Sequence, residues 1–578
     1  MEEVSERIMR QTLEAFIYEG IMDTERAEQE WLFTGIKADG GIVHYSCQAD
    51  EKWSFGRIKI KKGSIRREGE ICCNIYVFLE ELLQNKLSGL LTDQFIHELL
   101  ETLVKDQQSK ELQPEHISAE DRHYEALESH MTDGHPYHPS YKSRIGFSLT
   151  DNMAYGPEFN QNVHIHWVAV NEELTDVSVS PETSLNEIVK QHLTEEDITQ
   201  FQQIVQEKGN SRKKYIFLPV HPWQWEHRLQ SLFTQQWADK DMISLGTSSS
   251  AYRPQQSIRS LSHRSNAEAS YIKLSLSITN TSTSRILAHH TTQNAPLISN
   301  WLFKIIQNDP FLLKEQFQLL REVMGISFRY DEMQSIPYRL AYGTLGAIYR
   351  ENISVCLEEN EEAWPLNALF LIQKNGEPFI QKAIDQHGIR PWSEALIRTV
   401  TLPIIHLLYA HGIALESHAQ NIILVVENNF PKRIIVKDLH DGVRYTPDKL
   451  LRPDWAPKLH PEPETHRKFN RYSFLQTENV SEVRDYTYDA FFFICMTEIC
   501  FAFEKLGLSE IEFWQNCAQT ILTYQEAHPE YKERYEIFDL FSENALVEEM
   551  TKRRIYGDSE LYFRSVKNSL RLAKDLLL

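Results

Sequence analysis

The sequence contains little cysteine, and its cysteines are not arranged to cross-link the chain or to bind zinc. There are 7 cysteines among 578 residues, an odd number that is scattered along the chain and never forms a C-x-x-C pattern. Such usage is typical of reduced thiols and argues against both a disulfide scaffold and a zinc knuckle. We therefore expect a cytoplasmic protein.

Long apolar runs and an excess of positive charge are also missing. The longest apolar run is 491–496, far below the about 20 residues of a bilayer span, and the first residues lack the apolar core of a signal peptide. The 60 Lys and Arg residues face 82 Asp and Glu residues, which gives a net charge of −22. This charge disfavours general binding to nucleic acid or to an anionic membrane. An anionic substrate would therefore need a local cluster of cations.

The composition is that of a folded protein of mixed structure. Hydrophobic residues make up 42 % and charged residues 25 %, which is typical of globular chains. Helical spacing of apolar residues dominates 3–107 and the region after 488, whereas alternation typical of strands prevails between 134 and 297. We expect an α+β fold with helical N- and C-terminal parts and a β-rich middle. The expected strands are 53–60, 163–170, 271–278, 370–373 and 422–427.

Two loops of the middle region combine histidine with proline. Residues 134–146 read GHPYHPSYKSRIG, and residues 218–225 read LPVHPWQW. Proline fixes φ and prevents a helix, so the first loop is a stiff segment that presents His138, Lys142 and Arg144. These groups suit an anion. The alternatives are solvated charges with histidines that cap loops and, for the second loop, an aromatic structural turn.

The densest set of cations and hydroxyls follows the second loop. Arg259 lies in QSIRSL, Arg285 ends TNTSTSR, and Lys273 lies between them on an alternating strand. On that strand Lys273 would share a face with Ser275 and Ser277, and each arginine could bind an oxyanion through two N–H groups. The pattern G-x-x-x-x-G-K-[ST] is absent, so we expect a side-chain cradle for a triphosphate or a polycarboxylate. A Ser/Thr-rich surface loop is the alternative.

A polar hairpin is predicted further along the chain. Asn421 precedes an apolar strand and Asp438 ends the next one, within HGIALESHAQN and KDLHDG. A hairpin would bring their side-chain oxygens together, and carboxylate plus amide oxygen suits Mg²⁺. The spacing is similar to that of the Asn and Asp metal ligands of protein kinases, although H-R-D and D-F-G are missing. A polar turn with a core histidine is the alternative. His164 and His166 could also bind a metal, but buried or edge histidines are commoner.

Taken in order, these segments resemble the NRPS-independent siderophore synthetases of the aerobactin-synthetase (IucA/IucC-like) family over residues 134–442. The resemblance rests on G-H-P-Y-H-P-x-x-K-x-R, L-P-x-H-P-W-Q, S-I-R-S, K-L-S with N-T-x-x-x-R, and G-I-x-L-E-S-H-x-Q-N with K-D-x-x-x-G. It implies a homodimer with a cupped-hand fold: a thumb-like domain at 1–133, a fingers-like domain at 134–299 and a palm-like domain at 300–578. It also implies that a polycarboxylate and ATP form an acyl-adenylate, that pyrophosphate leaves, and that an amine or hydroxyl accepts the acyl group.

The same resemblance implies the roles of individual residues. The ATP phosphates would contact Ser257, Arg259, Ser260, Lys273 and His138. The carboxylate or its adenylate would contact Arg285, Thr281, His418 and Gln420, and the nucleotide and Mg²⁺ would contact Asn421 and Asp438. Lys273 and Arg285 would stabilise the charge that develops on the phosphate, and His418 would accept the proton of the amine. Two positions depart from the family pattern, because Ser260 replaces a threonine and Lys437 replaces an arginine.

The subtype is suggested by two short runs. Residues 155–159 and 416–418 look more like family members that activate a monoamide and finish the siderophore. We therefore expect an enzyme that condenses a citryl-monoamide with an amine (type C), and one that acts on free citrate (type A) is the alternative. Outside the family, a kinase-like phosphotransferase and a non-catalytic binder of an anionic metabolite remain open.

Overall fold

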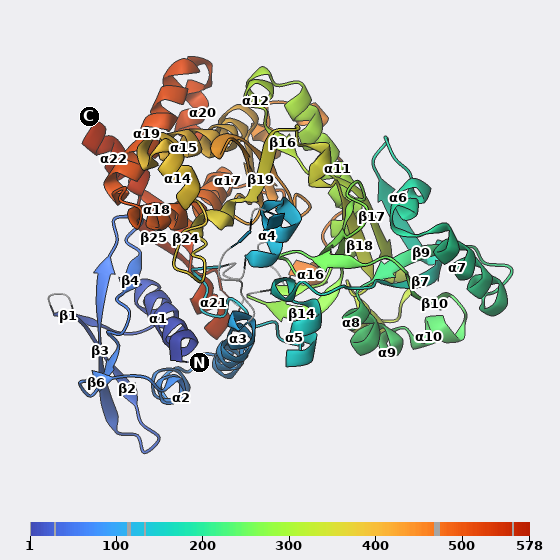
Figure 1. Cartoon of the computed structure of the whole chain (residues 1–578), viewed down its shortest axis with the longest axis horizontal. Coiled ribbons are helices and arrows are strands. Elements are labelled where there is room, and N and C mark those ends of the chain that lie inside the picture. The colour runs from blue at the N-terminus through green and yellow to red at the C-terminus, as the bar shows by residue number, and fades with distance from the viewer. Residues whose placement is uncertain are drawn as a thin grey trace.

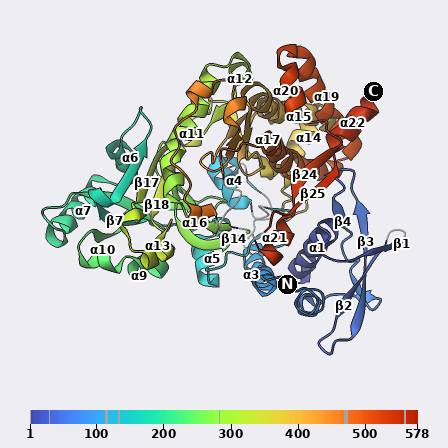
Figure 2. The same cartoon turned by 180° about the vertical axis from the view of Figure 1, so that it is seen from behind.

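The computed structural model describes residues 2–27, 30–111, 117–118, 120–131, 135–281, 283–467, 474–557 and 560–578. The structure is 46 % helical and 22 % strand, which confirms the predicted α+β class. The N-terminal strands and the middle strands lie on opposite sides of the molecule, and most of the C-terminal helices lie above the N-terminal strands (Figure 1). The view from behind shows the same arrangement (Figure 2).

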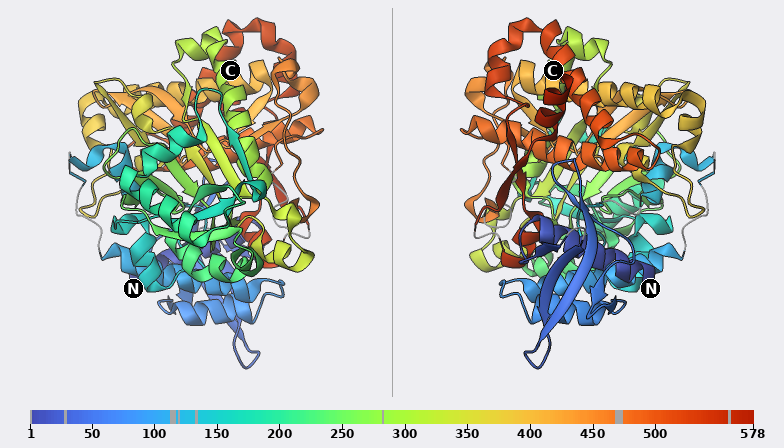
Figure 3. Two further views of the ribbon diagram at one scale, coloured as in Figure 1. Left: turned by 90° about the vertical axis from the view of Figure 1, so that its right-hand side faces the viewer. Right: turned by 90° about the vertical axis from the view of Figure 1, so that its left-hand side faces the viewer.

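The N-terminal part contains more sheet than the short segment that the sequence predicts. Its strands pair in the order β1-β2-β3-β5-β6, with β4 added to β3. In β3 the side chains of Val43, Tyr45 and Cys47 are buried and alternate with more exposed ones, so one face joins the core. The hairpin of β2 and β3 projects away from the C-terminal helices (Figure 3). The elements are α1 (Glu2–Tyr18), β1 (Glu25–Ala27), β2 (Glu30–Ile36), β3 (Ile42–Glu51), β4 (Ile58–Ile60), β5 (Arg66–Arg67), β6 (Glu70–Ile71), α2 (Ile75–Leu79), α3 (Thr92–Lys110) and α4 (Tyr124–His130).

The predicted strand 53–60 is wrong in its first half. Only its last three residues form a strand, β4, because Phe55 and Gly56 have φ values of 51° and 65°. These left-handed values turn the chain back and do not fit a strand. The ring of Phe55 instead packs against Phe493 and Trp514, with centroids 5.9 and 5.2 Å away. The N- and C-terminal parts therefore share one hydrophobic core.

A six-stranded sheet in the order β11-β12-β13-β18-β17-β8 lies at the centre of the middle part. Helix α11 (His289–Gln307) packs on β17 so closely that a Cβ on Gly325 would lie 1.7 Å from the carbonyl oxygen of Thr292. Strands β17 and β18 come after the predicted boundary at residue 299, which itself falls inside α11. The sheet therefore joins the middle and C-terminal parts, and the predicted division at 133 and 299 remains a prediction.

The middle strands have the following bounds. They are β7 (His166–Asn171), β8 (Thr175–Val179), β9 (Tyr215–Val220), β10 (Met242–Thr247), β11 (Tyr252–Pro254), β12 (Ser260–His263), β13 (Tyr271–Leu274), β14 (Leu276–Asn280), β15 (Thr283–Arg285), β17 (Glu322–Phe328) and β18 (Gly346–Arg350). The helices α5 (Leu149–Tyr155), α6 (Leu185–His192) and α7 (Glu195–Lys208) connect or cover them. The predicted strand 163–170 is confirmed from His166 on as β7, whereas Val163 forms only an isolated bridge with Tyr252.

Two further predicted strands differ from the structure. The run 271–278 forms two strands, β13 and β14, because β13 pairs with β18 whereas β14 pairs with β15. The run 370–373 is not a strand. Only Ile372 forms an isolated bridge, with Pro378, because the chain turns back at Gly376, where φ is 87°. The strand nearest to this run in sequence is β19 (Glu361–Pro365).

The predicted hairpin is confirmed. The strand expected at 422–427 is β21 (Ile422–Glu427), which pairs antiparallel with β22 (Phe430–Val436). Asn428 and Asn429 between them have φ values of 53° and 60°, as a two-residue type I′ turn requires. The main C-terminal helices are α14 (Gln381–His387), α15 (Ile389–His406), α19 (Glu510–Ala527), α20 (Lys532–Ile537), α21 (Met550–Tyr556) and α22 (Ser569–Leu577).

The apolar run 491–496 lies in a long helix, as expected. The helix consists of α17 (Val480–Thr487), the π-helical η12 (Tyr488–Met496) and α18 (Thr497–Glu504). Within the described residues it is the single helix that is long and apolar enough to cross a membrane by length and composition. Its most apolar window is 78 % buried inside the protein, which is typical of a core helix.

Candidate functional site

A cavity of about 350 Å³ lies where the middle part meets the C-terminal part. Its wall is formed by the loop after residue 135, the chain around β12 to β15, the β21–β22 hairpin and the long helix. Ten of the predicted site residues line it: His138, Ser257, Arg259, Lys273, Thr281, Arg285, His418, Gln420, Asn421 and Asp438. Ser260 does not line the cavity, but it pairs in register with Lys273. The structure therefore brings together side chains that are far apart in the sequence.

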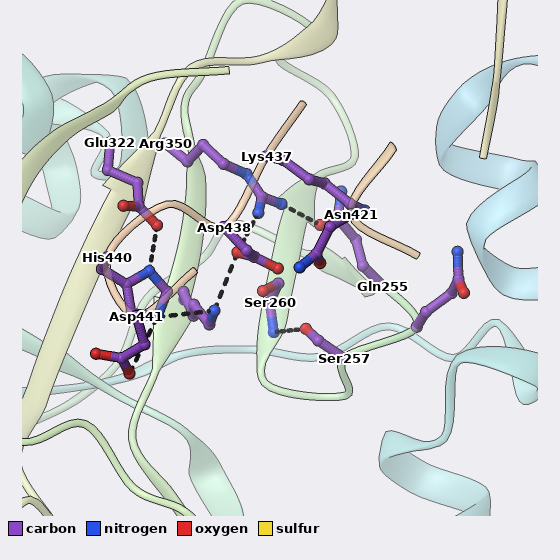
Figure 4. Close-up of polar contacts among 12 residues, drawn as sticks. Gln255, Ser257, Ser260, Glu322, Arg350, Asn421, Lys437, Asp438, His440 and Asp441 are labelled. Carbon is purple, nitrogen blue, oxygen red and sulfur yellow. Dashed lines mark hydrogen bonds and ion pairs between the residues drawn. The ribbon is translucent and has the colours of Figure 1, made fainter. Parts of the chain in front are cut away.

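Lys273 is held by acidic and histidine partners at the edge of β13. Its Nζ donates to Oδ1 of Asp438 at 3.0 Å and to Nε2 of His440 at 3.2 Å. Arg350 also donates to Oδ1 of Asp438, at 2.6 Å, and His440 donates through Nδ1 to Glu322 (Figure 4). Burial lowers the pKa of Lys273 to about 8. The pKa of Asp438 lies well below its usual range because Lys273 and Arg350 outweigh its burial.

Arg259 and Arg285 differ from Lys273 because they bind only neutral oxygens. Arg259 Nη1 donates to the carbonyl oxygens of Arg285 and Ile286 at 2.7 Å each. Arg285 Nη2 lies 3.3 Å from the carbonyl oxygen of Asn280 and from Oγ1 of Thr281. In the described part of the chain no carboxylate lies within 4.0 Å of either guanidinium. Burial lowers the pKa of Arg259 only to about 10, so it stays cationic at neutral pH, and a buried unpaired cation favours an anionic ligand.

Three positions next to these cations have a strained backbone. Ile258, Thr281 and Asp438 have φ values of 69°, 60° and 62°. Residues other than glycine rarely adopt the left-handed region of φ, and β-branched residues such as Ile258 and Thr281 avoid it most. Such strain concentrates at functional sites. The backbone at these three positions is therefore consistent with a functional role of the cavity.

The hairpin presents two oxygens that have no donor among the described residues. The N–H of Lys437 donates to the carbonyl oxygen of Asn421 at 3.0 Å, which closes the hairpin beside the cavity. Asn421 Nδ2 donates to the backbone and side-chain oxygens of Glu416, which leaves its Oδ1 uncommitted. In Asp438 the cations bind Oδ1 and leave Oδ2 uncommitted. One amide and one carboxylate oxygen fit a Mg²⁺ ion.

Lys437 does not contribute to the cavity. Its Nζ donates to Glu128 at 2.6 Å and to the hydroxyl of Tyr124 at 2.8 Å, and all three side chains are buried. The other oxygen of Glu128 accepts the N–H of Gln256 at 3.0 Å. Lys437 therefore fastens the end of β22 to α4, and Glu128 in turn fastens α4 to the loop that carries Ser257 and Arg259.

Burial disfavours the charged form of two histidines of the site, His138 and His418. Burial, aided by the cations Arg553 and Arg554, lowers the pKa of His138 to about 3. Burial also lowers the pKa of His418, and the rings of His418 and His135 lie 6.1 Å apart. His138 can therefore act as a hydrogen-bonding group but not as a cation, whereas His418 can accept a proton.

Several predicted contributions to the anion site are wrong. Lys142 and Arg144 are neither solvated nor free, because Lys142 pairs with Asp106 at 2.8 Å and Arg144 with Glu158 at 3.0 Å. Ser275 and Ser277 do not join Lys273, because the strand breaks between them. The hydroxyl of Ser275 donates to Gly346, and that of Ser277 accepts from Gln224.

Two further points concern His164 and His166, which the sequence allowed as metal ligands, and two residues that the structure does not describe. His166 is buried and stacks on Trp225 with ring centroids 4.0 Å apart, whereas His164 is exposed, so the two do not form a pair. Gly134 of the first loop and Ser282 of the cradle lie outside the described residues.

Sequence reasoning missed Arg350, His440 and Glu322, which complete the surroundings of Lys273. His440 stands two residues after Asp438 in KDLHDG, so the motif itself could have indicated it. Arg350 ends β18 and Glu322 begins β17, and the two residues face each other in the sheet register. No local pattern connects them to the hairpin.

Two family models match the chain. Residues 123–371 match the IucA / IucC family. Residues 390–562 match the family described as ferric iron reductase FhuF-like transporter.

Relatives extend over the whole chain. A "2-[(L-alanin-3-ylcarbamoyl)methyl]-3-(2-aminoethylcarbamoyl)-2-hydroxypropanoate synthase" of Staphylococcus aureus is 38 % identical over 575 residues, 98 % of this chain and 92 % of the relative. A "citryl-spermidine/3,4-dihydroxybenzoyl-citryl-spermidine:spermidine ligase" of Bacillus anthracis is 35 % identical over 581 aligned positions, 99 % of this chain and 94 % of the relative.

Solved structures share the fold. The petrobactin biosynthesis protein AsbB of Bacillus anthracis superposes with a TM-score of 0.91 at 34 % identity, covering 100 % of this chain and 96 % of that one. The ATP-bound aerobactin synthetase IucA of a hypervirulent Klebsiella pneumoniae pathotype has the same fold, with a TM-score of 0.74 at 17 % identity over 98 % and 99 % of the chains. The chain therefore belongs to the IucA/IucC-type family of NRPS-independent siderophore synthetases and is a ligase of siderophore biosynthesis.

Proposed function

We propose that this ligase uses ATP to adenylate a carboxylate of a citrate-derived acid and then joins the acyl group to an amine. The observation that carries the proposal is the pair of buried guanidinium groups of Arg259 and Arg285, which face one cavity with Lys273. Neither group has a carboxylate partner among the residues that the structure describes. In a chain of net charge −22 such a cluster suits a polyanion. The fold shared with an ATP-bound aerobactin synthetase also supports ATP as that polyanion.

In the first step a carboxylate oxygen of the acid attacks the α-phosphorus of ATP, and the bond to the β-phosphate oxygen breaks to release pyrophosphate. Negative charge develops on the phosphoryl oxygens, where preorganised cations lower the barrier most. Ser257, Arg259, Ser260, Lys273 and His138 would contact the phosphates. Thr281, Arg285 and Gln420 would orient the carboxylate.

In the second step the amine attacks the acyl carbon, the amide bond forms, and AMP leaves with the electron pair of the broken C–O bond. The nitrogen must lose a proton on the way. His418 is the candidate acceptor, because burial lowers its pKa and keeps the imidazole neutral.

Asn421 and Asp438 would hold a Mg²⁺ ion through their uncommitted oxygens. When bound, such an ion neutralises phosphate charge beside Lys273.

The names of the relatives support a reaction late in siderophore assembly, in which an acid that already carries one amide is joined to a second amine. The ligase of Bacillus anthracis acts on a citryl-spermidine, and the product of the Staphylococcus aureus enzyme carries two carbamoyl arms. A citryl-monoamide condensed with a second amine (type C) is therefore the lead, and free citrate (type A) is the alternative. A homodimer is part of the same proposal.

The test is ATP–pyrophosphate exchange with citrate, succinate, 2-oxoglutarate and citryl-monoamides as the acid. Exchange that depends on a citryl-monoamide, with AMP and pyrophosphate as the final products, is expected. Exchange with free citrate alone would replace type C by type A. Formation of ADP and a phosphorylated acid would overturn adenylation and favour a kinase-like phosphotransferase.

A further inference from the structure

A second cluster of metal-ligating side chains is buried away from the cavity. Oδ2 of Asp309 lies 3.0 Å from Nε2 of His406 and 2.8 Å from Nε2 of His411. All three residues are buried, and their ligand atoms lie within 4.8 Å of one another. None of them lines the central cavity. We propose that Asp309, His406 and His411 bind a divalent transition-metal ion, with Zn²⁺ as the reference metal.

The backbone is shaped to bring the two imidazoles together. His406 ends α15, and Leu407–His411 form a π-helical turn, η9, before Gly412 leaves the helix with a φ of 73°. In an α-helix, residues five positions apart point in different directions, because each residue turns by about 100°. A π-turn stacks such residues instead, and these turns are rare and frequent at functional sites. Here the two rings lie 5.7 Å apart.

The remaining atoms of the ligands are fixed by other groups. Oδ1 of Asp309 accepts the backbone N–H groups of Phe311 and Leu312 at 2.8 and 2.9 Å, as the cap of α12 (Pro310–Lys314). Nδ1 of His406 is hydrogen-bonded to the hydroxyl of Tyr524 at 2.7 Å. Protein metal sites orient their ligands in this way. The atoms directed toward a common point are therefore one carboxylate oxygen and two imidazole nitrogens.

The charge of the cluster also favours a cation. The side chain of Asp309 is 10 % exposed, and among the described residues no Lys or Arg nitrogen lies within 4.0 Å of it. A buried carboxylate is stable only when it is paired or bound to a metal. Zn²⁺ accepts His nitrogen and Asp oxygen in a tetrahedral arrangement, with a fourth position for water. The competing interpretation is a hydrogen-bonded triad in which both imidazoles donate to Oδ2.

The position of the cluster suggests what the ion would do. His411 is followed by Gly412 and β20 (Ile413–Leu415), and this strand leads to Glu416 and His418 in the cavity. A metal on His411 would join the start of this segment to α12 and α15. The inference concerns an ion bound away from the cavity and does not depend on the proposed reaction.

The experiment measures metal bound to the full-length protein after incubation with Zn²⁺ and desalting, by mass spectrometry of the eluted metal. We expect one tightly bound equivalent in the wild type, lost in Asp309→Asn and in His411→Gln. Asparagine keeps the oxygen that caps α12 but removes the charge, and circular dichroism checks that each variant folds. Co²⁺ in place of Zn²⁺ should give visible d–d absorption in the wild type but not in Asp309→Asn or His411→Gln.

The control is His290→Gln, because His290, Glu462 and His466 form another cluster that could hold a metal. This variant should keep the equivalent and the Co²⁺ spectrum. Zn²⁺ should also raise the Tm of the wild type and of His290→Gln but not that of Asp309→Asn. A wild type that retains no Zn²⁺ after desalting would overturn the proposal and leave the hydrogen-bonded triad. Equal retention by wild type, Asp309→Asn and His411→Gln would overturn it as well.

Discussion

Nζ of Lys273 lies 3.0 Å from Oδ1 of Asp438, although the two residues are 165 positions apart in the sequence. The contact joins the central sheet to the β21–β22 hairpin. It places the cation proposed for the phosphates beside the carboxylate proposed for the metal.

Replacing Lys273 by alanine should abolish most of the activity while the protein stays folded. Loss of one preorganised donor to a developing oxyanion lowers kcat by about 10²- to 10³-fold. The measurement is acyl transfer trapped as a hydroxamate, with circular dichroism as the check of folding. Lys213→Ala is the matched control, because Lys213 pairs with Asp241 away from the cavity and should leave turnover unchanged. Near-normal turnover of Lys273→Ala would remove the cradle hypothesis.

Replacing Arg285 by lysine should weaken binding of the acid even though the charge is kept. A lysine cannot bind a carboxylate through two parallel N–H groups. Loss of one charged hydrogen bond corresponds to about a tenfold or larger rise in KM. Arg285→Ala should lose activity altogether. An unchanged KM for the acid in Arg285→Lys, measured by pyrophosphate exchange, would place the carboxylate elsewhere.

Replacing Lys437 by methionine should destabilise the fold. The change leaves the buried carboxylate of Glu128 without its cation, which costs about 3–5 kcal/mol. Urea unfolding measures the loss. The double variant Lys437→Met with Glu128→Gln should recover much of the stability, because no buried charge is then left unpaired. A single variant as stable as the wild type would show that the pair is not a structural link.

The activity should decrease at alkaline pH through Lys273. Its pKa is about 8 in the folded protein and about 10.4 in the unfolded chain, so the folded state loses the proton first. The cation needed for ATP therefore disappears above pH 8, and kcat/KM should fall there. Stability moves the opposite way, because between these pKa values the unfolded state binds more protons and this group's contribution rises with pH. Lys273→Arg should move the alkaline limb to higher pH, and a limb at the same pH would assign it to another group.

The acid limb should report His418. Burial lowers the pKa of His418 below its ordinary value, so the imidazole stays a proton acceptor below pH 6.5. We expect His418→Gln to lower kcat for amide formation and to abolish the acid limb of its pH profile, with pyrophosphate exchange less affected. If the profile of this variant kept its shape, His418 would not be the base.

The sequence predicted the parts of the site that depend on neighbouring residues. The hairpin was predictable because its apolar strands flank two asparagines that tolerate a left-handed backbone. The cationic residues were predictable because Arg259, Lys273 and Arg285 stand out in an acidic chain. These features are encoded within a few residues of each position.

Features that depend on contacts between distant segments were missed or misplaced. The alternation of 271–278 predicts one strand, but two different partners, β18 and β15, divide it at Ser275. In the sequence the charges of Lys142 and Arg144 suit an anion, but in the folded protein Asp106 and Glu158 neutralise them. The π-turn that joins His406 to His411 has no recognisable signal in the local sequence.

By itself the sequence determined the class of the fold, the family and the residue types that converge on the cavity, because periodicity, turn residues and short motifs are local properties. The tertiary structure alone decided which cations remain unpaired. The charge of a side chain is available to a ligand only if no opposite charge packs against it, and that depends on how sheets and helices from distant segments meet.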